Sequence, residues 1–154
     1  AFRSPFQIAI DSGAMVSVFP PWYASDYPIL PLRGEQVHYQ LNGPGGEIIP
    51  CQGRRMIHLE LIPGLLATFE VLVCDVKFPL LALKDLTSKG MSVHFGEEDV
   101  GCIEHQRSAE LIPFEFSNGL WILTPHTLIP YEISTYILKP FLEGISMIQA
   151  TLIK

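Results

Sequence analysis

The sequence predicts an all-β domain, and three observations support that prediction. Apolar and polar residues alternate over short stretches such as Met56 to Leu61, which is typical of half-buried strands. Turn-forming pairs such as Asn42-Gly43 and Asn118-Gly119 separate such stretches. Apolar residues at helical spacing occur over a longer stretch only near the C-terminus. The 154 residues are enough for one domain with a genuine core.

Composition excludes several function classes. Hydrophobic residues make up 48% of the chain and charged residues only 17%, against about 25% in typical soluble domains, so we expect some of the surface to be buried against partners. The net charge is −6 and there is no run of Lys or Arg, so nucleic acid is not expected as a partner. No apolar stretch reaches the roughly 18 residues of a membrane span.

Cysteine usage indicates an intracellular, reducing compartment. Cys51, Cys74 and Cys102 are odd in number and widely spaced, so we expect free, buried thiols. Cys102 and His105 have a spacing that zinc ligands can have, but no second Cys/His pair accompanies them. Neither a metal nor another cofactor is predicted.

Two apolar arms flank an acidic turn near the N-terminus. Phe6, Ile8 and Ile10 alternate with smaller or polar residues before the turn, and Val16 and Val18 alternate after it. The turn itself is Asp11-Ser12-Gly13-Ala14, which places one carboxylate at the ends of two buried strands. An ordinary hairpin turn is the simpler interpretation of the tripeptide alone.

The stretch from Ile8 to Val18 resembles the signature of the retropepsin-like aspartic proteases of retroviruses and LTR retrotransposons. In that family a hydrophobic strand leads into Asp-Thr/Ser-Gly-Ala and then into a second apolar strand. The resemblance implies a closed β-barrel or sandwich of one acid-protease lobe, with a flap hairpin and one short helix. It also implies that Asp11 is catalytic and that Ser12, Gly13 and Ala14 form the active-site loop.

The next segments are an irregular loop and a glycine-rich hairpin. Prolines punctuate residues 20–31, and Trp22 and Tyr23 there are either lids on the core or part of a substrate pocket. Strands are expected from Val37 to Leu41 and again from Ile48. The turn between them resembles the family's flap, which implies that it contacts substrate through Asn42, Gly43, Pro44, Gly45 and Gly46. Any surface hairpin would fit the same residues.

The resemblance continues in order to Phe95. Phe69 to Val76 resembles the family's closing strand, and Lys84 to Lys89 its terminal helix. Between them lies a second loop of the site, formed by Leu80, Leu81 and Ala82. Ala82 stands where the family usually has Gly. Met91 to Phe95 would be the last strand of a core domain spanning residues 1–95.

Two further segments follow this core. Residues 96–126 are predicted to form an additional hairpin around Asn118-Gly119, with strands over Ala109 to Phe116 and Leu120 to Leu123. Residues 127–154 form an apolar tail with one or two helices. The tail holds so much apolar surface that it must dock, and we expect it to dock on another protein subunit.

The resemblance implies an aspartic endopeptidase that acts on a polypeptide substrate. Only one signature Asp occurs, and Asp26, Asp75, Asp85 and Asp99 lack its context. Asp11 would therefore act as one half of a homodimeric site. The alternative is a domain of the same fold that serves as a non-catalytic structural or interaction subunit.

Overall fold

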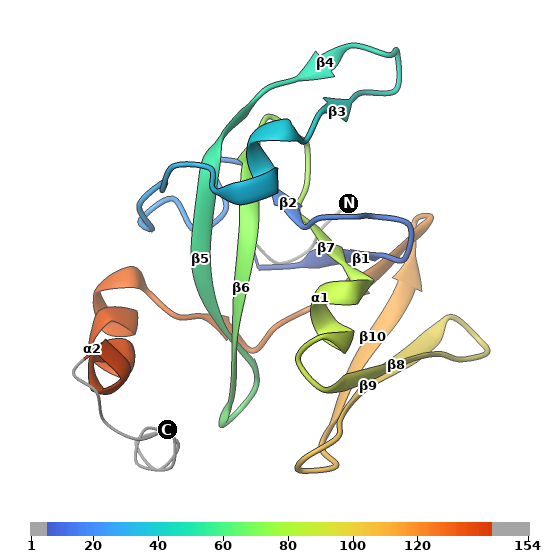
Figure 1. The fold of residues 1–154 in the computed structure, drawn as a ribbon. Helices are drawn as coiled ribbons and strands as arrows, with labels where there is room; N and C mark the ends of the chain where they lie inside the picture. The colour runs from blue at the N-terminus through green and yellow to red at the C-terminus, as the bar shows by residue number, and fades with distance from the viewer. Residues whose placement is uncertain (1–5, 143–154) are drawn as a thin grey trace.

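Strands dominate the chain. The computed structural model describes residues 6–142, in which the only two α-helices are α1 (Leu83–Thr87) and α2 (Tyr131–Leu142) (Figure 1). The prediction of an all-β fold is therefore confirmed. Neither of these helices is long and apolar enough to span a bilayer.

The strands fall into one large sheet and one small hairpin. In chain order they are β1 (Ile8–Asp11), β2 (Val18–Phe19), β3 (Leu41–Asn42), β4 (Ile48–Ile49), β5 (Cys51–Ile62), β6 (Leu65–Cys74), β7 (Leu80–Ala82), β8 (Met91–Phe95), β9 (Val100–His105), β10 (Leu111–Ser117), β11 (Leu120–Leu123) and β12 (Thr127–Leu128).

The large sheet is open. Its ten strands follow the order β12-β5-β6-β2-β7-β1-β11-β10-β9-β8, so β12 and β8 are its two edges. Within residues 6–142 no pairing joins these edges, so the closed barrel or sandwich expected from the sequence is not confirmed. β12 has only two residues, and it pairs with β5 alone.

The core draws on strands from the whole chain. Alternate residues of β6 from Leu65 onward point inward and are buried, and Phe69 and Val71 among them are at most 1% exposed. They join Phe19 from β2, Leu81 from β7 and Leu123 from β11 in one buried cluster. Burial of such side chains stabilises the fold by about 1.5–3 kcal/mol each.

A buried arginine organises the loop over residues 20–31, which is irregular as predicted. Arg55 on β5 donates hydrogen bonds to the carbonyl oxygens of Pro21 (2.9 Å), Tyr23 (3.1 Å) and Tyr27 (3.0 Å). Burial lowers the pKa of Arg55 from its usual value. Tyr23 is 2% exposed and covers the core, whereas Trp22 is 53% exposed.

The prediction of a strand from Val37 to Leu41 is wrong. A 3-10 helix occupies Gly34–His38, and β3 begins only at Leu41. The Gln36 side chain accepts a hydrogen bond from the Arg33 N–H (2.9 Å), and the Gln36 N–H donates to the Arg33 carbonyl (3.1 Å). These bonds favour a helical turn over an extended strand.

Residues 96–126 belong to the main sheet. β10 and β11 are joined by a turn at Asn118 (φ 53°) and Gly119 (φ 82°), as the Asn-Gly pair predicts. β11 then pairs antiparallel with β1, and Ile10 lies opposite Trp121. The hairpin therefore extends the sheet directly beside the strand that carries Asp11.

The first part of the C-terminal tail packs on its own domain, contrary to the expectation that the tail docks on another protein. Ile129 is 9% exposed, and its carbonyl accepts a hydrogen bond from the Tyr27 hydroxyl. The Tyr131 N–H donates to Asp26 Oδ2 over 2.8 Å at the start of α2. The predicted docking role of residues 143–154 lies outside the described residues.

Truncation tests the contribution of this segment to stability. A chain that ends at Pro125 loses β12, the buried Ile129 side chain and the acceptor of the Tyr27 hydroxyl. We expect its melting temperature to fall by about 5 °C or more, measured by thermal unfolding. A chain that ends at Leu142 is the control, because it keeps α2 and all the contacts named here. Equal melting temperatures for the Pro125 and Leu142 chains would contradict the packing described here.

Candidate functional site

Strand β7 lies between the two arms of the Asp11 loop. β1 runs parallel to β7, with Asp11 opposite Ala82, and β2 runs antiparallel to it, with Val18 opposite Leu80. The loop over residues 12–17 must therefore cross the end of β7 to connect β1 with β2 (Figure 1). This crossing leaves Asp11 at the end of a buried strand, next to an exposed loop.

The Asp11 carboxylate is fixed by its own loop. The Gly13 N–H donates a hydrogen bond to Asp11 Oδ1 over 2.9 Å, and the half-buried Ala14 donates its N–H to the Asp11 carbonyl over 3.4 Å. A side-chain carboxylate that accepts from the backbone two residues on forms an Asx turn. The carboxylate is half-buried, so a second molecule can reach it.

Gly13 is not required by the fold of the single chain. It is exposed, its φ is not positive, and an added Cβ would meet only Asp11 Oδ1 at 3.6 Å, an ordinary contact. Ser12 is exposed too, and it makes no hydrogen bond within residues 6–142.

Ser17 braces the loop within the chain, and the sequence interpretation missed it. This residue is 2% exposed; its hydroxyl donates to Asp85 Oδ2 on α1 and accepts the Ala82 N–H over 2.9 Å. One hydroxyl thus joins the loop, β7 and α1. The available signal was a hydroxyl residue between Val16 and Val18, directly before a buried strand.

The predicted second loop is a strand. Leu80, Leu81 and Ala82 form β7, which has a neighbour on each side, so pairing with β1 and β2 fixes it in an extended conformation. Leu81 and Ala82 are fully buried. The short helix predicted over Lys84 to Lys89 is found at Leu83–Thr87.

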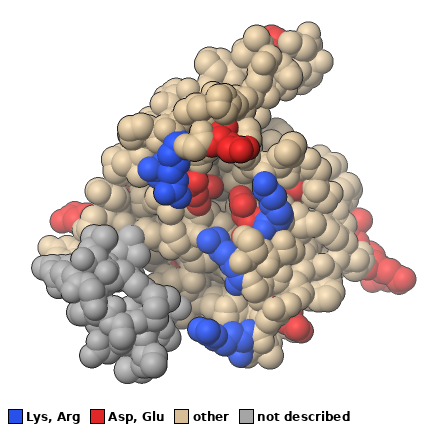
Figure 2. Space-filling view, in the orientation of Figure 1, with Lys and Arg blue, Asp and Glu red and all other residues tan. Residues whose placement is uncertain are grey.

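The predicted flap is a protruding hairpin. β3 and β4 pair only with each other. Two hydrogen bonds close the turn between them: the Gly43 N–H donates to the Glu47 carbonyl (2.8 Å), and the Gly46 N–H donates to the Gly43 carbonyl (3.0 Å). Gly46 has φ 82°, a conformation that favours glycine. The hairpin, which includes Asn42, Pro44 and Gly45, projects from the body of the molecule (Figure 2). Glu47 is the one charged residue between Leu41 and Ile49.

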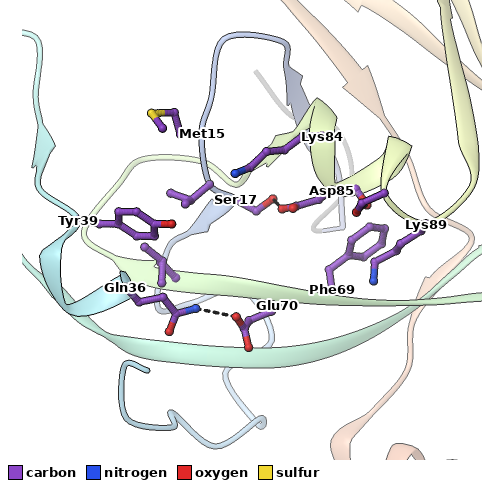
Figure 3. A pocket seen from close by; sticks show the side chains of 12 residues that line it. Met15, Ser17, Gln36, Tyr39, Phe69, Glu70, Lys84, Asp85 and Lys89 are labelled. Carbon is purple, nitrogen blue, oxygen red and sulfur yellow. Dashed lines mark hydrogen bonds between the residues drawn. The ribbon is translucent and has the colours of Figure 1, made fainter. Parts of the chain in front are cut away.

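A cavity of about 230 Å³ opens beside the Asp11 loop. The loop contributes Met15, Val16 and Ser17, and Figure 3 shows Lys84, Asp85 and Lys89 around the same cavity. The remaining lining residues come from β6, α1 and the segment around the 3-10 helix, and are Gln36, Tyr39, Phe69, Glu70, Leu72 and Ser88.

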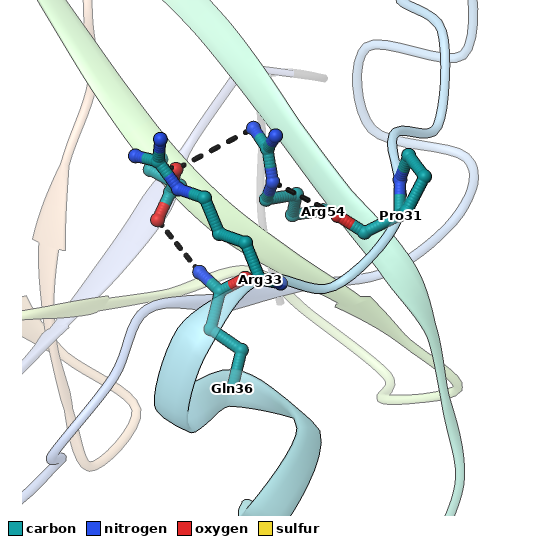
Figure 4. A network of polar contacts seen from close by, with 5 residues as sticks. Pro31, Arg33, Gln36 and Arg54 are labelled. Atoms are coloured by element: carbon teal, nitrogen blue, oxygen red, sulfur yellow. Dashed lines mark hydrogen bonds and ion pairs between the residues drawn. The ribbon is translucent and has the colours of Figure 1, made fainter.

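Both acids of the cavity are already engaged. Glu70 accepts a hydrogen bond from Gln36 Nε2 (2.6 Å) and pairs with Arg33 Nη2 (2.6 Å) and Arg54 Nη1 (3.5 Å), while Arg54 also donates to the Pro31 carbonyl (Figure 4). Asp85 accepts the Ser17 hydroxyl.

The two lysines of the cavity have no acidic partner among residues 6–142. Lys89 Nζ lies 5.5 Å from the centre of the Phe69 ring, and Lys84 is exposed. Figure 2 shows basic and acidic side chains mixed on this face. The cavity therefore combines apolar side chains with two cations that no acid among residues 6–142 neutralises. No group of three or more His, Cys, Asp or Glu in the described range could hold a metal ion.

Replacement of Ser17 tests the brace. In Ser17→Ala the buried Ala82 N–H loses its acceptor, so we expect a loss of about 1–3 kcal/mol in the free energy of unfolding, measured by urea denaturation. The matched control is Ser12→Ala, which removes an exposed hydroxyl from the same loop and should change stability by less than about 0.5 kcal/mol. Equal effects of the two substitutions would refute the brace.

Comparison with known proteins adds no assignment to this geometry. No protein-family model matches the chain, and no curated protein matches it by sequence. The function of the site is therefore argued from the arrangement of Asp11, its loop, the hairpin and the cavity.

Proposed function

We propose that the chain is an aspartic endopeptidase of the retropepsin type, with one catalytic aspartate, Asp11, in each subunit of a homodimer. The observation that carries the proposal is the position of Asp11 at the end of a buried strand, its carboxylate oriented by the Gly13 N–H. The position of β7 between β1 and β2, the two arms of the Asp11 loop, supports the assignment of this fold to one lobe of an acid protease.

The reaction needs two carboxylates that share one proton. One carboxylate accepts a proton from the attacking water while the other donates its proton to the carbonyl oxygen of the scissile peptide; like charges about 3 Å apart cannot both ionise. Two other acids of the chain are used elsewhere, because Asp26 accepts the Tyr131 N–H and Asp85 accepts the Ser17 hydroxyl. A second copy of Asp11, related by a two-fold axis, would supply the missing carboxylate.

The exposed residues of the loop fit this arrangement. Gly13 has no steric reason within the single chain to lack a side chain. A glycine there leaves room for a substrate backbone or a second subunit to approach the carboxylates. The hairpin over residues 41–49 would cover the bound peptide and exclude water.

The cavity beside the loop supports a substrate with an acidic side chain. Met15 and Val16 offer apolar contacts to the stem of such a side chain. The ammonium groups of Lys84 and Lys89, which pair with no acid among residues 6–142, offer charge to its carboxylate. We therefore include a preference for Glu-containing peptides in the proposal.

A non-catalytic interaction subunit is the second candidate, and one surface favours it. The ring centroids of Phe95, Phe114 and Phe116 lie 5.1–5.4 Å from that of Trp121. Phe95 is 43% exposed and Phe116 37%. Exposed aromatic groups of this kind are enriched at protein interfaces.

Replacement of Asp11 separates the two candidates. Asp11→Asn keeps an oxygen that accepts the Gly13 N–H, so the fold should be retained while peptidase activity disappears. Activity is measured as pepstatin-sensitive cleavage of a mixed peptide library between about pH 4 and 7. Asp75→Asn, at an exposed acid outside the site, is the control and should stay active. Full activity of Asp11→Asn would rule out the catalytic assignment, and an inactive native chain would favour the interaction subunit.

Substitution of the lysines tests the substrate preference. In Lys84→Gln and Lys89→Gln we expect kcat/KM for a Glu-containing peptide to fall by about two- to fivefold each, with little change for a matched Gln-containing peptide. Lys77→Gln removes an exposed charge that does not line the cavity and should leave both values unchanged. Equal losses on both peptides would contradict an acid-binding role.

A further inference from the structure

Two cysteines meet where the hairpin joins the main sheet. Cys51 is the first residue of β5, Cys74 is the last residue of β6, and the two lie opposite each other in the antiparallel pair. Their Sγ atoms are 2.7 Å apart, and both thiols are free. A disulfide bond places the sulfurs about 2.0 Å apart, so a small movement suffices to form one.

We propose that Cys51 and Cys74 form a site of reversible oxidation, at which a small-molecule disulfide such as glutathione disulfide converts the two thiols into a disulfide bond. This inference rests on the position of the two sulfurs. It holds whether or not the chain cleaves peptides.

The different environments of the thiols set the order of events. Cys51 is half-buried, so an oxidant can reach it, whereas Cys74 is fully buried. Burial raises the pKa of the Cys74 thiol. Cys51 is therefore the residue that reacts first, and Cys74 is the residue that resolves the intermediate.

The chemistry balances in two exchange steps. The Cys51 thiolate attacks one sulfur of glutathione disulfide, whose S–S bond breaks, and one glutathione leaves as a thiolate. Cys74 Sγ then attacks Cys51 Sγ, and the second glutathione leaves and takes up the Cys74 proton. The protein loses two electrons and two protons, and the glutathione disulfide is reduced to two glutathione molecules.

The bond would anchor the base of the hairpin. Cys51 and Cys74 pack in a second buried cluster with Leu41 of β3, Ile49 of β4 and Val18 of β2. That cluster joins the hairpin to β2, the strand that follows the Asp11 loop. A covalent link within it restricts how far β3 and β4 can move relative to the sheet.

Cys102 is an internal control. It lies on β9 opposite Pro113 and His94, it is half-buried like Cys51, and no other cysteine faces it. Accessibility alone would make Cys51 and Cys102 react alike, so only the pairing with Cys74 distinguishes them.

The experiment treats the native full chain with glutathione disulfide and maps the thiols by mass spectrometry of a digest prepared without reduction. We expect a Cys51–Cys74 linked peptide, with Cys102 either free or carrying glutathione. Hydrogen exchange of amides in residues 41–51 should slow in the oxidised protein, and dithiothreitol should reverse both changes.

Variants make the result decisive. Cys74→Ala should stop at the mixed disulfide on Cys51, and Cys51→Ser should leave the buried Cys74 unmodified. Cys102→Ser should still form the linked peptide, and circular dichroism checks that each variant is folded. The proposal is wrong if the native protein keeps glutathione on Cys51 and forms no Cys51–Cys74 disulfide. It is also wrong if Cys102 forms a disulfide with Cys51 or Cys74 as readily as these two do with each other. The same holds if Cys51 and Cys74 stay unmodified.

Discussion

The candidate site depends on the insertion of β7 between β1 and β2. β7 is only three residues long, yet it pairs with both arms of the Asp11 loop and leads directly into α1. Ser17 reinforces the insertion, because its hydroxyl accepts from the β7 backbone and donates to Asp85 on the helix. The position of the Asp11 carboxylate therefore depends on residues some 70 positions further along the chain.

Local patterns in the sequence predicted the elements that local chemistry controls. Alternation located β5, the Asn118-Gly119 pair located the turn between β10 and β11, and the glycines located the exposed hairpin. The 3-10 helix at Gly34–His38 was missed because it depends on one side chain, that of Gln36, which bonds to the Arg33 backbone.

Long-range partners could not be read from the sequence. The strand character of Leu80 to Ala82 arises from neighbours on both sides, and β12 is fixed by pairing with Glu60 and Leu59 on β5. The sequence identified Asp11 as the candidate acid but not Ser17 as its support. A serine among valines indicates a buried hydroxyl only when its partners, here Asp85 and Ala82, are known.

The pairing of β1 with β11 bears on the order in which the protein folds. Ile8 lies opposite Leu123, so one side of β1 stays unpaired during synthesis until the chain beyond residue 120 has emerged from the ribosome. The other side of β1 stays unpaired until β7 has been synthesised. Closing loops of this length makes such contacts slow to form. A nascent chain therefore carries an unassembled Asp11 loop until almost all of the sheet has been made, which delays any activity of the site until synthesis of the domain is nearly complete.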